Sequence, residues 1–183
     1  MKFSAFKHLK GFTLIELLIV IAILGVLASA VLIAINPLEQ LARGRDAGRK
    51  SSVRQLGGAV QSYYTGQNSA YVTADNAWMT ALQTAGELKT LPSNPTASGY
   101  TTGCFTATAV ATSGGTSLGY CYQANATEAI VYARAESKSF VTTAGCNPTT
   151  QLTWIVWSSA DGKTGVTCTG ISADPSIGVV NLK

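Results

Sequence analysis

The fold of this chain is decided by one N-terminal stretch, Lys10-Gly11-Phe12-Thr13-Leu14-Ile15-Glu16-Leu17, which opens a long apolar run. The run extends from Phe12 to Ile35 over 24 residues, and its only members that are not apolar are Thr13, Glu16, Gly25 and Ser29. As an α-helix it rises about 1.5 Å per residue and so exceeds the roughly 30 Å hydrocarbon thickness of a bilayer. The run therefore predicts a membrane-spanning helix.

The carboxylate of Glu16 is out of place in such a helix. A charged side chain within a span costs about 2.5–3.5 kcal/mol on insertion scales, so Glu16 needs a partner. The run is also too long for the apolar region of a secretory signal, which covers about 7–15 residues. An uncut N-terminal anchor with Glu16 reaching to the membrane surface is the alternative interpretation, but Glu16 would then gain nothing.

The residues around Glu16 follow a specific pattern: a short basic leader, then a glycine, a phenylalanine, and a glutamate four residues further on. These positions are filled by Lys2, Lys7, Lys10, Gly11, Phe12 and Glu16. The pattern resembles the processing site of type IV prepilins and related pseudopilins. The resemblance is strong over residues 7–36, weaker to about Pro95 and architectural beyond it.

This resemblance implies three roles. A prepilin peptidase cuts after Gly11, the new N-terminal Phe12 becomes methylated, and Glu16 docks subunits. The Phe12 amine of one subunit can neutralise the Glu16 carboxylate of its neighbour. The costly buried charge would then fix the register in which the helices of neighbouring subunits stack. The leader lysines would stay on the cytoplasmic side.

The chain is then expected to have four segments. A cleaved leader occupies 1–11, a membrane-spanning and filament-core helix 12–36, the amphipathic second half of that helix 37–65, and a disulfide-bonded globular α+β domain 66–183. A break is expected at Asn36-Pro37, because proline removes a backbone donor and disfavours helix in the residue before it.

The second half of the helix has a weak helical signal in its first part and a clear one in its second. The helical spacing of apolar residues is indistinct through 43–50, where Gly44 and Gly48 weaken the helix. It returns at Val53, Leu56, Val60 and Tyr63. This apolar stripe is expected to pack on the distal domain.

Charge is concentrated next to the spanning helix. The net charge is +4, and without the leader lysines ten basic residues face nine acidic ones. The segment from Glu39 to Arg54 holds the excess, with basic side chains at Arg43, Arg45, Arg49, Lys50 and Arg54. Two interpretations stay open: contact with lipid headgroups or carboxylates of neighbouring subunits, or a solvated helix face. From Gln55 onward the five basic and six acidic residues give no field for nucleic acid.

The distal part has signals for one short helix and several strands. Ala77–Ala85 is predicted to be helical, with Asn76 as N-cap, Gly86 as stop, and a core face listed as Trp78, Met79 and Leu82. Strands are predicted at 120–123, 129–135 and 152–158. A turn at 160–163 should join 154–158 and 164–168 into a hairpin. Three or four antiparallel strands packed on the long helix give an α+β ladle, the shape that pilins have.

Four cysteines all lie in the distal part, at Cys104, Cys121, Cys146 and Cys168. An even set without a CxxC pair predicts two disulfides in an exported domain rather than a zinc site. Three connectivities are possible. We favour Cys104–Cys121 and Cys146–Cys168, because neighbours in sequence close the shortest loops.

The sequence carries no recognisable catalytic or cofactor motif. The only histidine, His8, lies in the leader, no phosphate-binding loop is present, and Asp161 and Asp174 are isolated carboxylates. We therefore expect no enzyme activity, no cofactor and no metal. Asn125-Ala126-Thr127 fits a glycosylation sequon, a triplet that is common by chance.

The function indicated is that of a structural subunit of a type IV pilus, in a surface filament for adhesion, motility or DNA uptake. It would reside in the cytoplasmic (inner) membrane before assembly, with its distal domain outside the cytoplasm, and then in an extracellular homo-oligomeric filament. Its partners would be prepilin peptidase and the inner-membrane pilus or secretion machinery. One alternative is a pseudopilin of a type II secretion system. Another is a minor pilin that binds DNA or a surface, but basic side chains on the distal domain are too few to indicate nucleic acid.

Overall fold

The computed structural model describes residues 11–93, 104, 109–113, 116–178, 180 and 182. The chain divides into two compact units, residues 1–40 and 41–183. Residues 1–10 of the leader lie outside the described residues, as do 94–103 and 105–108.

The first unit contains helix α1, Leu14–Ile35, and the start of α2, Pro37–Gly66. The helices are separated by Asn36, whose φ of 48° places it in the left-handed region. The Asn36 carbonyl accepts hydrogen bonds from the backbone N–H groups of Glu39 and Gln40, so Asn36 ends one helix and begins the next. Pro37 occupies the first helical position, where a missing N–H is harmless. The predicted break at Asn36-Pro37 is confirmed.

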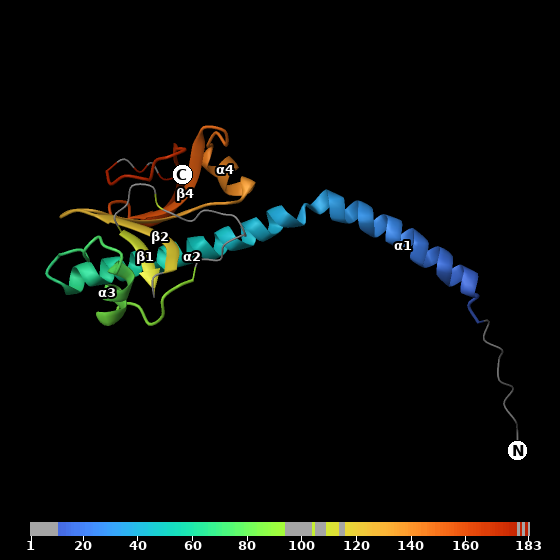
Figure 1. The fold of residues 1–183 in the computed structure, drawn as a ribbon, viewed down its shortest axis with the longest axis horizontal. Coiled ribbons are helices and arrows are strands. Elements are labelled where there is room, and N and C mark those ends of the chain that lie inside the picture. Colours follow the sequence, from blue (N-terminus) through green and yellow to red (C-terminus); the bar gives the residue numbers. More distant parts are fainter. Residues whose placement is uncertain are drawn as a thin grey trace, which may run out of the picture. The chain divides into compact units, whose positions relative to one another are not determined.

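The second unit is built on a five-stranded antiparallel meander in the order β1-β2-β3-β4-β5 (Figure 1). The strands are β1 Ala109–Ser113, β2 Thr116–Ala124, β3 Ala129–Arg134, β4 Gln151–Ser158 and β5 Lys163–Gly170. The predicted α+β class and the predicted 154–168 hairpin are confirmed, with Ser158 paired to Lys163 at the turn. β1 is the additional strand, and it lies in a Thr/Ser/Gly/Ala-rich stretch with only a weak signal.

The strands alternate their side chains between two apolar layers, as the period of two in a strand requires. On one face Tyr122, Val131 and Ile155 share a core with Val53 and Leu56 of α2. This confirms the stripe expected on the second half of the long helix. On the other face Tyr132 and Trp154 pack with residues of the C-terminal segment, listed as Ile177, Val180 and Leu182. The sheet is therefore covered on both faces.

Two short helices complete the second unit: α3, Trp78–Thr84, and α4, Lys138–Ala144. The core face predicted for the first is confirmed, because Trp78, Met79 and Leu82 are buried. Asn76 as its N-cap was wrong: the capping position is Ala77, without a side-chain hydrogen bond. The carboxylate of Asp75 instead accepts the N–H of Ala77.

The sequence did not predict α4, which is too short for its periodicity to be visible. Its only local signals are Ser137, whose hydroxyl accepts the N–H of Phe140, and Gly145, whose φ of 64° closes the helix. Ser and Gly occur at these places in many helices, but the same residues are also frequent in loops.

Candidate functional site

The N-terminus of α1 is shaped by a reciprocal capping box between Thr13 and Glu16. The Thr13 hydroxyl accepts the N–H of Glu16 at 3.3 Å, and the Glu16 carboxylate accepts the N–H of Thr13 at 2.8 Å. The Thr13 hydroxyl also donates to the same carboxylate oxygen, Oε2, at 2.8 Å. Because the first N–H groups of a helix have no partner within it, a carboxylate there is favourable.

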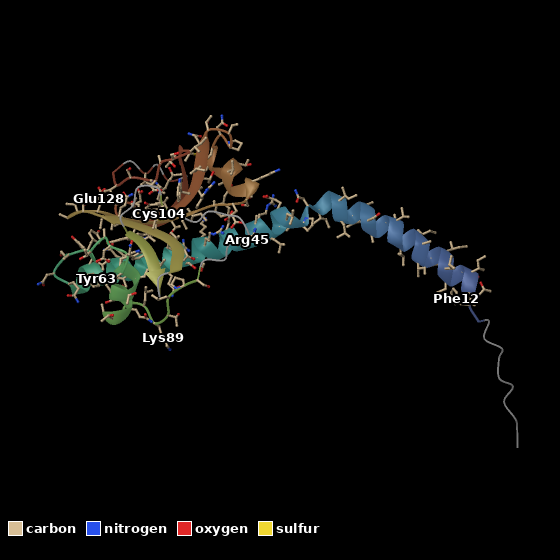
Figure 2. The ribbon with its side chains drawn as sticks, viewed as in Figure 1. Phe12, Arg45, Tyr63, Lys89, Cys104 and Glu128 are labelled. Atoms are coloured by element: carbon tan, nitrogen blue, oxygen red, sulfur yellow. A yellow bond between two sulfur atoms is a disulfide. The ribbon has the colours of Figure 1, made fainter. Side chains whose placement is uncertain are left out.

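This geometry adds a partner for Glu16 within its own chain. The sequence predicted that the Phe12 amine of a neighbouring subunit neutralises the Glu16 carboxylate, and the N-terminus of its own helix also stabilises that charge in part. The sequence signal for this capping box is Thr13 followed three residues later by Glu16. Phe12, which precedes the cap, is 85% exposed and lies at the end of α1 (Figure 2).

Helix α1 itself has no buried residue, although almost all of its residues are apolar. It is long and apolar enough to cross a membrane, with a mean hydropathy of 3.1. An apolar surface on every side of a helix is not the pattern of one that packs on a single core. Helix α1 requires apolar surroundings from lipid or from other chains.

The segment that runs from the leader into α1 matches a known family model. Residues 7–32 match the family model of the prokaryotic N-terminal methylation motif. With the apolar helix α1, the match supports a type IV pilin-like or pseudopilin protein, synthesised as a prepilin. It implies processing by prepilin peptidase, membrane anchoring before assembly, and entry into pilus or secretion machinery. No curated protein and no solved structure matches the chain.

The basic segment at residues 39–54 is not simply a solvated helix face. Arg49 is fully buried and donates to Asp46 Oδ1 at 2.7 Å and to Glu136 Oε1. Arg45 donates to Glu136 Oε2 at 2.7 and 2.9 Å, and it lies on α2 (Figure 2). Neither a contact with lipid headgroups or neighbouring subunits nor a solvated helix face describes Arg45 and Arg49. Both interpretations were wrong for these two residues, because their guanidinium groups form ion pairs within their own unit.

Asp46 connects this ionic cluster to the backbone before α4. Its carboxylate accepts the N–H of Glu136 at 3.0 Å and the N–H of Ser137 at 2.7 Å. Burial raises the pKa of Glu136, but hydrogen bonds from Arg45 and Arg49 outweigh burial and hold that pKa below its ordinary value. The cluster of Arg45, Asp46, Arg49 and Glu136 thus joins α2 to the segment between β3 and α4.

The cluster also explains why α2 is continuous through 43–50. The sequence predicted a weakened helix there because of Gly44 and Gly48. In the structure Asp46 and Arg49 are held by a segment about ninety residues away, with separations of 90 and 87 to Glu136. Because Glu136 is so far away in the sequence, the only local sign of this contact is that Asp46 and Arg49 are three residues apart, which places them on the same side of a helix.

The four distal cysteines pair as Cys104–Cys121 and Cys146–Cys168 in the structure, with Cα separations of 6.0 and 5.5 Å. Both separations lie in the usual range for disulfides. The first bridge joins Cys104, which precedes β1 in the chain and is labelled in Figure 2, to Cys121 of β2. The second joins Cys146, two residues after the end of α4, to Cys168 of β5. Among the described residues no group of three or more His, Cys, Asp or Glu side chains is arranged to hold a metal ion.

Proposed function

We propose that this protein is a structural subunit of a type IV pilus, which is stored in the membrane and then packed helix to helix into a surface filament. The observation that carries the proposal is the helix α1, which begins at the methylation motif and buries none of its apolar residues within the subunit. Such a helix has two suitable environments, lipid before assembly and the α1 helices of other subunits afterwards.

Processing would generate the docking group. A cut after Gly11 leaves a free, methylated Phe12 amine directly before the Thr13–Glu16 capping box. Within the described part of the chain, the hydrogen bonds that the Glu16 carboxylate accepts all end on Oε2. Oε1 is then the oxygen that a neighbouring subunit's Phe12 amine would bind, and the capping box would hold the carboxylate in place for it.

The remaining segments have separate tasks in this proposal. Residues 12–36 form the filament core, 37–65 connect the core to the distal domain, and 66–183 form the outer surface. The two disulfides suit a domain that works outside the cytoplasm. The subunit has a structural role and performs no catalysis, so its partners are other copies of itself, prepilin peptidase and the inner-membrane assembly machinery.

The test compares Glu16→Ala with Glu16→Gln, because Gln keeps the capping hydrogen bond but removes the charge. Both variants should insert in the membrane and be cleaved, and both should give few or no filaments in electron micrographs of sheared surface material. Glu128→Gln, which changes an acidic residue in the distal unit, is the control and should assemble normally. Filaments of normal number and length from Glu16→Gln would show that the charge does not dock subunits.

The same material separates the pilus from its nearest alternative. Mass spectrometry should identify this chain, starting at Phe12, as the main component of the sheared filaments. Its absence from them, together with loss of secreted proteins on deletion, would instead assign the chain to a secretion pseudopilus.

A further inference from the structure

The connection between β2 and β3 carries the triplet Asn125-Ala126-Thr127 on a tight, exposed turn. Ala124 and Ala129 are paired across the hairpin, so the turn contains only the four residues between them. Asn125, Ala126 and Thr127 are all exposed. Glu128, the last residue of the turn, lies at the tip of the hairpin (Figure 2).

The side chain of Asn125 is held in one conformation. Its Oδ1 accepts the N–H of Thr127 at 2.8 Å, the hydroxyl of Thr127 at 3.1 Å and the N–H of Glu128 at 2.7 Å. The amide nitrogen and the threonine hydroxyl, the two groups that define a glycosylation sequon, are thus presented together on one turn. Three donors on Oδ1 also polarise the amide and make its N–H group easier to deprotonate.

The chain contains an internal comparison for this site. Asn147 makes two of the three contacts in Asn147-Pro148-Thr149, where its Oδ1 accepts the N–H of Thr149 at 3.0 Å and the hydroxyl of Thr149 at 2.9 Å. That turn is also exposed, but its middle residue is proline, which sequons exclude. In the full sequence Asn94-Pro95-Thr96 is excluded in the same way, so Asn125 heads the one sequon without proline.

We propose that Asn125 is an N-glycosylation site. The donor is a sugar joined through phosphate to a lipid carrier, and the catalyst is an oligosaccharyltransferase on the outer side of the membrane. Nδ2 of Asn125 attacks the anomeric carbon of the sugar, and the bond from that carbon to the phosphate oxygen breaks. The lipid phosphate leaves with the electron pair, and the Nδ2 proton passes to a base of the transferase.

The proposal rests on export of the distal domain, which is part of the proposed function. A glycan at Asn125 would project from the hairpin tip into solvent. Because the residues on either side of the turn are paired in the sheet, its attachment would require no change in the core.

The test is peptide mapping by tandem mass spectrometry of the full chain, purified from membranes and sheared surface material of the cells that make it. The Asn125 peptide should carry a glycan, and the Asn147 peptide should be unmodified. Thr127→Ser should keep the glycan because the hydroxyl remains. Thr127→Val, which has nearly the same shape without the hydroxyl, should lose it.

A gain-of-site variant tests whether the turn geometry is what the transferase accepts. Pro148→Ala converts the second turn into a sequon in which the asparagine already contacts the N–H and the hydroxyl of its threonine, so Asn147 should become glycosylated. Failure of Pro148→Ala to acquire a glycan would overturn the claim that an exposed turn of this geometry is sufficient. An unmodified Asn125 in protein whose disulfides have formed would overturn the glycosylation proposal alone, whereas free thiols would overturn export.

Discussion

Gly57 on α2 is the position where a single methyl group should do most damage. A Cβ built on Gly57 lies 2.6 Å from Cε2 of Trp157 and closer still to two other atoms of the indole. Real Cβ atoms essentially never approach another heavy atom within 3.0 Å. Trp157 is only 5% exposed, and its backbone is paired on both sides, with Val131 and Thr164, so its buried ring cannot move away together with the strand. Gly57→Ala must therefore push α2 away from the sheet.

The size of the effect follows from two opposing terms. Overpacking of this kind costs typically about 1–3 kcal/mol, and overlap with an immobile ring places it near the upper end. Replacing Gly by Ala within a helix returns about 1 kcal/mol. We expect Gly57→Ala to lower the free energy of unfolding by about 2 kcal/mol, which corresponds to a fall in Tm of about 4–8 °C.

Gly58 is the matched control, because a Cβ built there meets no atom within 4 Å. Gly58→Ala should gain the helix term alone, about 1 kcal/mol, and raise Tm by about 2–4 °C. The assay is thermal unfolding of the full-length chain in detergent micelles, followed by tryptophan fluorescence. All three tryptophans, Trp78, Trp154 and Trp157, are buried and will report loss of the core.

The result that would refute this reasoning is a Gly57→Ala protein as stable as the Gly58→Ala protein. A double variant adds a second check. Trp157→Leu removes the ring that the new methyl group would strike, so its effect and that of Gly57→Ala should be non-additive, with the double variant more stable than the sum predicts. Additive effects would mean that Gly57 and Trp157 do not compete for the same space.

Three further outcomes are expected. Because the pKa of Glu136 is lowered in the folded state, its stabilising effect is present above the ordinary value of 4.5 and is lost as the pH falls through the folded pKa; Glu136→Gln should therefore be less stable than the natural protein at neutral pH, and the stabilities of the two proteins, taken from unfolding curves, should converge as the pH falls through the folded pKa of Glu136. Gly11→Val should accumulate the uncut precursor on immunoblots, because a prepilin peptidase site needs a small residue there; filament subunits that still begin at Met1 would contradict the processing scheme. Peptide mapping without reductant should recover the two linked peptide pairs, and breaking either bridge with serine should cost about 3 kcal/mol in the chain-entropy estimate; free thiols in exported protein would be evidence against both bridges.

Local patterns in the sequence determined much of this protein. The apolar run from Phe12 specifies a helix because, in an apolar environment, a helix is the structure in which a single segment satisfies its own backbone polar groups. Asn36-Pro37 specifies the break because proline removes a donor and restricts its predecessor. The strands at 129–135 and 152–158 were visible because β-branched and aromatic residues are concentrated in them.

The tertiary structure decided what depends on residues far apart in the chain. The direction of Arg45 and Arg49 is set by Glu136, and the covering of the outer sheet face is set by a C-terminal segment with no strong pattern. Gly57 faces Trp157 and leaves no space for a Cβ, whereas Gly58 has open space around it, and this difference is decided by the packing of α2 on the sheet. These features come from packing and from charge pairing at long sequence separation, and neither leaves a periodic trace that a single sequence can show.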